Sequence, residues 1–115
     1  MSVIIYHNPR CSKSRETLAL LQKKAIQPII IEYLKDPPTR KQLIDILDKL
    51  GLSPRELMRT KEAVYQEKKL YKQSLTRDQL IAAMLADPVL IERPIVLANG
   101  KAAIGRPPEN VLEIL

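Results

Sequence analysis

The sequence predicts an α/β fold in which an opening β-α-β unit and a closing β-β-α unit are separated by a block of helices. Two short β-branched apolar runs, at residues 3–6 and 28–33, flank a segment with helical spacing. Helix-capping patterns recur between residues 39 and 87. The last quarter holds an Asn-Gly pair between two apolar runs, which is a strong hairpin signal. At 115 residues the whole chain, 1–115, fits one domain with a helical insertion at about 39–87.

The opening unit begins with Val3–Tyr6, which is predicted to be a buried strand. A helix is expected from Ser12, with Leu18 and Leu21 on its apolar face. Pro28–Tyr33 is predicted to be the second strand. The order strand–helix–strand predicts a right-handed crossover and a parallel pair of strands.

In the middle block, the sequence marks where the helices begin. Capping boxes are predicted at three places, Thr39–Gln42, Ser53–Glu56 and Thr76–Gln79. Gly51 is expected to end the first of these helices. We also expect Thr60 to cap a short helix that runs through Tyr65.

The closing unit is predicted from a turn signal. Pro94–Leu97 and Lys101–Ile104 are expected to pair antiparallel through a type I′ turn at Asn99–Gly100. A final helix is expected from about Glu109 to Leu115. Without the middle block, the order of elements is that of a thioredoxin-like domain. We therefore expect a mixed sheet of about four strands.

Composition narrows the functional classes. The net charge is +6, but aromatic residues make up only 3%, so stacking platforms for nucleic acid are not expected. A small oxyanion partner suits this charge, and the alternative, which the charge alone favours, is a solvated basic surface. No apolar run approaches the roughly 20 residues that a membrane span needs, and no secretory signal is visible. We expect a monomer in the reducing cytoplasm, without nucleic-acid or membrane partners.

Cys11 is the only cysteine, which excludes an intrachain disulfide and a thiolate zinc cluster. It precedes the first predicted helix, whose free N–H groups and partial positive charge favour a thiolate. Arg10, Lys13 and Arg15 add positive charge, and His7 is placed to pair with the thiolate or to orient it. The alternatives are a buried structural cysteine and a hydrogen-bonded loop histidine.

The spacing around Cys11 limits the chemistry. Cys11–Ser14 has the C-x-x-C spacing of a redox pair, but Ser14 takes the place of the second cysteine. A catalytic cycle through a disulfide therefore needs an external thiol. A cysteine phosphatase site is disfavoured, because Thr17 occupies the position where Cys-x5-Arg requires arginine.

Three arginines are candidate oxyanion ligands. Arg59 ends a predicted helix, and Arg93 and Arg106 each precede a proline in loops of stiff geometry. Arginine gives fixed, bidentate contacts to tetrahedral oxyanions. The alternative for each of the three is a solvated surface arginine.

Three separated motifs resemble the glutaredoxin-coupled arsenate reductase family, and the resemblance covers nearly the whole chain. The motifs are His7–Arg15, Arg93–Val96 and Gly105–Glu109. The resemblance implies a thioredoxin-like fold with an inserted helical region. It also implies an oxidoreductase that reduces arsenate to arsenite, with no metal and no bound organic cofactor.

The resemblance further implies a role for each matching residue. Cys11 would form a covalent adduct with arsenate, and His7 would favour its thiolate. Arg59, Arg93 and Arg106 would hold the oxyanion, and Pro94 would be a cis-proline against the cysteine. Glutathione would attack the adduct as co-substrate, and glutaredoxin would resolve the mixed disulfide.

Arg10 departs from the family pattern, which has a small residue at that site. Two other functions stay open at this point. One is a glutathione-linked thiol oxidoreductase with another substrate. The other is an Spx-like regulator that binds RNA polymerase, although Ser14 removes the Cys-x-x-Cys switch that such regulators commonly carry.

Overall fold

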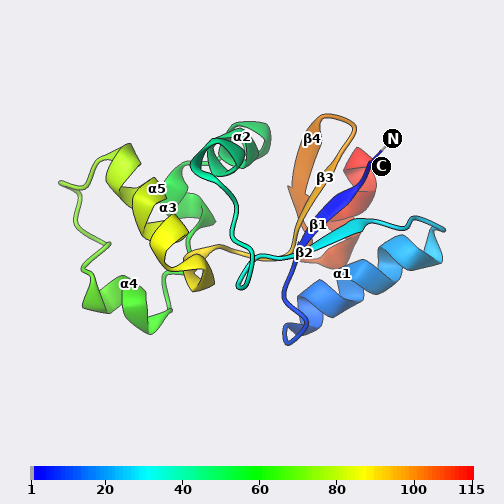
Figure 1. Cartoon of the computed structure of the whole chain (residues 1–115), viewed down its shortest axis with the longest axis horizontal. Helices are drawn as coiled ribbons and strands as arrows, with labels where there is room; N and C mark the ends of the chain where they lie inside the picture. The colour runs from blue at the N-terminus through cyan, green and yellow to red at the C-terminus, as the bar shows by residue number, and fades with distance from the viewer. Residues whose placement is uncertain (1) are drawn as a thin grey trace. The chain divides into compact units, whose positions relative to one another are not determined.

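The computed structural model describes residues 2–115, which form two compact units. The first unit combines the chain up to Asp36 with Arg93–Leu115, and the second is Pro37–Glu92. Sheet and helices of the first unit come from both ends of the sequence, as Figure 1 shows by colour. The second unit contains helices and no strand among its residues. The single-domain boundary 1–115 stays a prediction.

The first unit is built on a mixed four-stranded sheet in the order β2-β1-β3-β4. Strand β1 pairs parallel with β2 and antiparallel with β3, and β3 pairs antiparallel with β4. The predicted four-stranded mixed sheet is thereby confirmed. The elements of this unit are β1 (Ile4–His7), α1 (Ser12–Lys23), β2 (Ile29–Glu32), β3 (Ile95–Ala98), β4 (Lys101–Ile104) and the 3₁₀ helix η2 (Pro108–Ile114).

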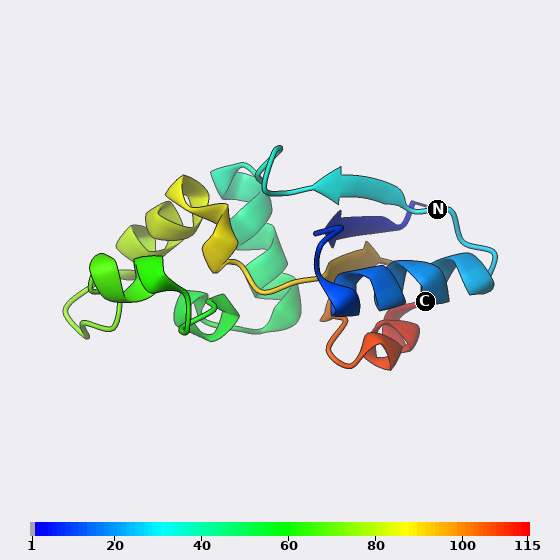
Figure 2. The same ribbon diagram turned by 90° about the horizontal axis from the view of Figure 1, so that it is seen from below.

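The aliphatic core of this unit lies between the sheet and two helices. Helices α1 and η2 lie side by side, and both contribute to one buried cluster with β1 and β3 (Figure 2). Ile5, Leu21, Val96 and Val111 are fully buried in it. Ile5 and Val96 lie opposite each other in the register of β1 and β3. The core therefore packs α1 against the central strands.

The turn between β3 and β4 has the predicted type. Asn99 and Gly100 both have positive φ, 54° and 73°, as a type I′ turn requires. Ala98 and Lys101 pair on either side of it. The short-range Asn-Gly signal was therefore sufficient to locate this hairpin.

The second unit is helical and carries all three predicted capping boxes. Thr39, Ser53 and Thr76 each accept a backbone N–H from the third helical residue, whose side chain binds back. Gly51 ends α2 in the left-handed conformation, with φ of 68°. The elements are α2 (Arg40–Leu50), α3 (Pro54–Leu57), α4 (Ala63–Glu67), α5 (Arg77–Ala86) and the 3₁₀ helix η1 (Pro88–Leu90).

One local prediction, the Thr60 cap, was wrong. Helix α4 begins at Ala63 after Glu62, so Thr60 does not cap it. A turn in which the Glu62 N–H donates to the Arg59 carbonyl at 3.2 Å occupies Thr60 instead. The expected final helix is present, and it is the 3₁₀ helix η2, which begins at Pro108. Pro107 and Pro108 lack the N–H donors that its start would otherwise offer.

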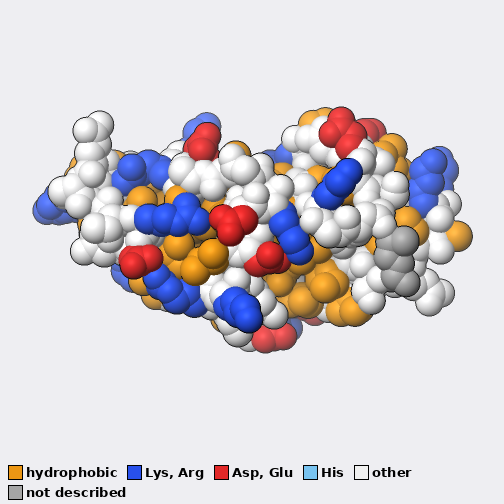
Figure 3. All heavy atoms as spheres, turned by 90° about the horizontal axis from the view of Figure 1, so that it is seen from above, with side chains coloured by type: hydrophobic (Ala, Val, Ile, Leu, Met, Phe, Trp, Pro, Cys, Tyr) orange, Lys and Arg blue, Asp and Glu red, His pale blue; other side chains and the backbone are white. Residues whose placement is uncertain are grey.

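The described part of the chain contains no helix long and apolar enough to cross a membrane. Within residues 2–115 no group of three or more His, Cys, Asp or Glu side chains could hold a metal ion. On the face shown in Figure 3, Lys and Arg side chains are interspersed with Asp and Glu. The positive charge on that face is therefore not gathered into one continuous patch.

Candidate active site

Cys11 is the N-cap residue of α1 and is held there by a short, tightly bonded loop. The Cys11 N–H donates to the Asn8 carbonyl at 3.0 Å, and the Arg15 N–H donates to the Cys11 carbonyl at 3.0 Å. The Asn8 side chain accepts the Arg10 N–H at 3.0 Å, as an Asx turn does. Cys11 itself has an extended backbone, with φ of −93° and ψ of 124°. Its side chain therefore lies beside the free N–H groups of the first helical turn.

The pKa of the Cys11 thiol is lowered from its ordinary value. Burial raises this pKa, and it is the largest single influence. It is outweighed by the Ser14 and Lys13 backbone N–H groups, the Arg93 charge and the Arg106 side chain, which all favour the thiolate. A structural core cysteine would lack these partners, so the environment favours the reactive anion.

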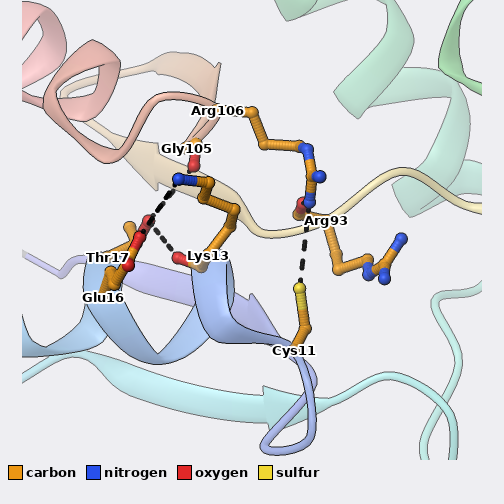
Figure 4. A network of polar contacts seen from close by, with 7 residues as sticks. All are labelled: Cys11, Lys13, Glu16, Thr17, Arg93, Gly105 and Arg106. Carbon is orange, nitrogen blue, oxygen red and sulfur yellow. Dashed lines mark hydrogen bonds and ion pairs between the residues drawn. The ribbon is translucent and has the colours of Figure 1, made fainter.

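Arg106 is the side chain that meets the sulfur. Its Nη1 lies 3.8 Å from Cys11 Sγ, within the range of a hydrogen bond to sulfur. The same Nη1 donates to the Arg93 carbonyl at 3.3 Å. Figure 4 shows the sulfur directed toward this guanidinium group, with the Arg93 side chain beside it. Residues 95 positions apart in the sequence thus place a guanidinium group against the thiol.

Pro94 links Arg93 to the start of β3. The Arg93–Pro94 peptide bond is cis, the geometry that the resemblance implied. The Pro94 carbonyl accepts the Gly105 N–H at 2.9 Å, which joins the start of β3 to the end of β4. The same connection brings Arg93 and Arg106 to one end of the sheet. The Arg106–Pro107 bond is also cis.

Arg59 lies in the helical unit, and its surroundings there are well defined. Its Nη1 is 3.3 Å from Glu62 and its Nε is 3.8 Å from Glu92. Its backbone N–H donates to the Leu90 carbonyl at 2.7 Å. The two acidic neighbours hold the guanidinium group in place. A position of Arg59 at the oxyanion stays a prediction.

His7 is buried at the end of β1, and its partner is Ser14. The two atoms His7 Nδ1 and Ser14 Oγ are 2.6 Å apart. Burial lowers the pKa of His7; Glu32 raises it and Arg15 lowers it further, with a net shift below 6.5. His7 is therefore neutral at pH 7, and its contact here is with a hydroxyl rather than with the thiolate.

The sequence does not identify Ser14 as a functional residue, because in the C-x-x-C spacing it marks only the lack of a second cysteine. Its Oγ accepts the Asn8 N–H at 3.0 Å in addition to bonding His7. Its own N–H is the largest favourable influence on the Cys11 thiolate. The available signal was the third position of a helix, where a side chain can return to the preceding loop.

Arg10 has no side-chain contact with Cys11 among the interactions of the described residues. It is exposed and lines a hollow with His7, Glu32 and Lys35. It is not among the groups that account for the lowered pKa of Cys11. The charge next to the thiol in sequence is therefore less influential than Arg106, which is distant in sequence.

Comparison with known proteins gives a consistent result. Residues 6–114 match the model of the ArsC family. The chain is 54% identical to the arsenate reductase of Haemophilus influenzae over 116 residues, covering all of both chains. It is 57% identical to the Escherichia coli protein YfgD over 114 residues, which are 98% of this chain and 96% of that one.

Solved structures agree with the fold. The arsenate reductase from Vibrio cholerae superimposes with a TM-score of 0.97 at 55% identity. The match covers 100% of this chain and 98% of that one. The four-stranded mixed sheet with its inserted helices is thus a thioredoxin-like architecture already seen in a close relative.

Proposed function

The chain belongs to the ArsC family, and we propose that it reduces arsenate to arsenite with Cys11 as its nucleophile. It is an oxidoreductase of the arsenate reductase class. One observation carries the assignment of the site: Arg106 Nη1 lies 3.8 Å from the sulfur of a thiol whose pKa is lowered. A cation beside a thiolate both activates the nucleophile and favours an anionic substrate.

The first step follows from this geometry. The Cys11 thiolate attacks arsenic and forms a sulfur–arsenic bond. One arsenic–oxygen bond breaks, and the oxygen leaves as water after taking up protons. Arsenic is still pentavalent in this adduct. We assign Arg106 and Arg93 to hold the remaining oxygens, because both approach the thiol from the same end of the sheet.

The second step needs an external thiol, since Cys11 is the only cysteine in the sequence. We propose that glutathione attacks the Cys11 sulfur. A sulfur–sulfur bond forms, and the electron pair of the sulfur–arsenic bond stays on arsenic, which leaves as trivalent arsenite. Glutaredoxin then reduces the mixed disulfide and restores the thiolate. A reducing cytoplasm suits this cycle.

We assign His7 and Arg59 supporting roles. Neutral His7 holds Ser14, whose N–H favours the Cys11 thiolate, so His7 acts through Ser14. Arg59 is the third oxyanion ligand in this proposal. Its guanidinium group makes ion pairs with Glu62 and Glu92.

The direct test is consumption of NADPH with arsenate in the presence of glutathione, glutaredoxin and glutathione reductase. The wild-type protein is expected to turn over, and Cys11→Ser is expected to be inactive. Turnover no higher than that of Cys11→Ser would contradict the proposal.

Two alternative functions make different predictions from arsenate reduction. A thiol oxidoreductase for another substrate would need Cys11 but would survive loss of Arg93 or Arg106. A regulator would need a redox switch at Cys11 and Ser14, and the Ser14 hydroxyl is instead engaged with His7 and the Asn8 N–H. This engagement favours the enzyme.

A further inference from the structure

Gly105 lies so close to α1 that no other residue fits there without movement. A Cβ atom on Gly105 would be 2.4 Å from Thr17 Oγ1 and 3.0 Å from Thr17 Cγ2. It would also lie 2.9 Å from Pro94 Cγ. Gly51 and Gly100 differ, because each has a positive φ and open space around the added Cβ. Gly105 is thus required by packing, whereas the other two are favoured by backbone conformation.

Thr17 is the α1 side of this contact. It is fully buried, on the same face of α1 as Ser14 and Leu21. Its Oγ1 donates to the Lys13 carbonyl at 2.8 Å and lies 3.4 Å from the Gly105 carbonyl (Figure 4). The hydroxyl is satisfied within the helix, so the side chain can face the end of β4 without an orphaned polar group.

The contact is one residue away from the side chain that contacts the thiol, because Arg106 follows Gly105. A hydrogen bond holds the backbone at each end of this two-residue segment. The Gly105 N–H donates to the Pro94 carbonyl, and the Arg106 carbonyl accepts Asn110 Nδ2 at 3.1 Å. The position of the Arg106 Cα atom therefore depends on how closely Gly105 approaches α1. Cys11 is the N-cap of the same helix, six residues before Thr17 in the sequence.

We propose that Thr17 and Gly105 are positioning residues whose close contact sets the distance between the Arg106 guanidinium group and the Cys11 thiolate. The contact acts as a spacer between α1 and the end of β4. Widening it moves Arg106 away from the sulfur, which lowers thiolate stability and weakens oxyanion binding together. The effect on thiolate stability does not depend on the substrate. The effect on oxyanion binding rests on the proposed arsenate reductase function.

The main test compares Gly105→Ala with Thr17→Ala and with the double variant. The readouts are the pH dependence of Cys11 alkylation by iodoacetamide and the KM and kcat for arsenate. Gly105→Ala is expected to raise the thiol pKa, to slow alkylation at pH 7 about threefold or more, and to raise the KM about tenfold. In the double variant the new methyl group fills the space left by Thr17, so both effects shrink.

Gly100→Ala is the matched control, because it changes the other glycine of the same hairpin. It strains a residue with φ of 73° but meets nothing within 4 Å. It is expected to lower stability and to leave the thiol pKa unchanged. An equal pKa shift in Gly100→Ala, or a wild-type pKa and KM in folded Gly105→Ala, would overturn the proposal.

A second pair of variants keeps the test decisive if Gly105→Ala does not fold. Thr17→Val keeps the shape of the contact and is expected to keep the thiol pKa. Thr17→Ile adds one methylene group at the same contact and is expected to raise it. Equal pKa values in these two variants would contradict the spacer role. Absence of arsenate turnover in the wild type would contradict only the proposed function, since the pKa comparison needs no substrate.

Discussion

Cys11 owes its reactivity to groups that are near in sequence and to groups that are far. The Ser14 and Lys13 N–H groups come from its own helix, and Arg93 and Arg106 come from the opposite end of the chain. The local groups are present wherever a helix begins. The distant arginines are the part that the tertiary fold adds.

Loss of Arg106 should weaken both functions assigned to it. In Arg106→Ala the thiol pKa is expected to rise, because a cation 3.8 Å from the sulfur is removed. The kcat/KM for arsenate is expected to fall about 10²- to 10³-fold, the usual cost of one oxyanion-stabilising donor. Alkylation rates against pH and the coupled NADPH assay measure the two effects.

Arg10→Ala is the matched control for this comparison. Arg10 precedes Cys11 directly but is not among the groups that account for its lowered pKa. Its alkylation profile should follow that of the wild type. A shift as large as that of Arg106→Ala would mean that general positive charge, rather than the Arg106 contact, stabilises the thiolate.

The buried His7 should make the protein less stable in mild acid. Its pKa is below 6.5 in the folded state, mainly because burial disfavours the imidazolium. The unfolded chain therefore binds more protons than the native state as pH falls through 6.5 and toward the lowered pKa. The free energy of unfolding should fall across this interval.

Urea unfolding at pH 7 and pH 5 measures this effect, with His7→Gln as the comparison. The variant lacks the titrating group, so its stability should change less between the two pH values. An equal loss in both proteins would assign the acid sensitivity to carboxylates instead.

The helix starts could be predicted because they are local. Thr39, Ser53 and Thr76 each stand three residues before Gln or Glu, and a capping box needs only that spacing. The prediction of a cap at Thr60 failed because a turn from Arg59 to Glu62, and the hydrogen bond from the Arg59 N–H to the Leu90 carbonyl, determine the backbone there. Those bonds depend on the fold around Ile91, which pairs with Met58 as an isolated bridge.

Loss of one N-cap side chain should lower the free energy of unfolding by a measurable amount. Thr76→Ala removes the side chain that accepts the Gln79 N–H at 3.2 Å. It is expected to lower the free energy of unfolding by about 1 kcal/mol, and Thr76→Ser should restore most of it. Thr60→Ala is the control, because Thr60 is equally exposed and caps nothing. Urea unfolding measures all three, and an equal loss in Thr60→Ala would contradict the assignment of the caps.

At the scale of the whole molecule, the site depends on strand order. Strands β1 and β3 are neighbours in the sheet although the entire helical unit separates them in sequence. The sequence predicted Cys11, Arg93 and Arg106 as candidates, since charge and motif are visible residue by residue. It did not predict the Thr17–Gly105 contact or the bond between His7 and Ser14. Both depend on the packing of side chains whose types are unremarkable by themselves.

Of the three proposed oxyanion ligands, Arg59 is the one that lies outside the unit that activates the thiol. All groups that lower the Cys11 pKa belong to the first unit, whereas Arg59 belongs to the second. Arg59→Ala should therefore keep the wild-type alkylation profile. If Arg59 is the third oxyanion ligand, the KM for arsenate should rise about tenfold or more, as expected for one charge-assisted hydrogen bond.

Arg77→Ala is the matched control for the helical unit, because Arg77 is an exposed arginine whose nearest acidic partner is Asp48 at 3.7 Å. It should change neither the alkylation profile nor the KM. A wild-type KM in Arg59→Ala would leave Arg59 as a structural partner of Glu62 and Glu92. A shifted thiol pKa in Arg59→Ala would mean that thiol activation also depends on the helical unit.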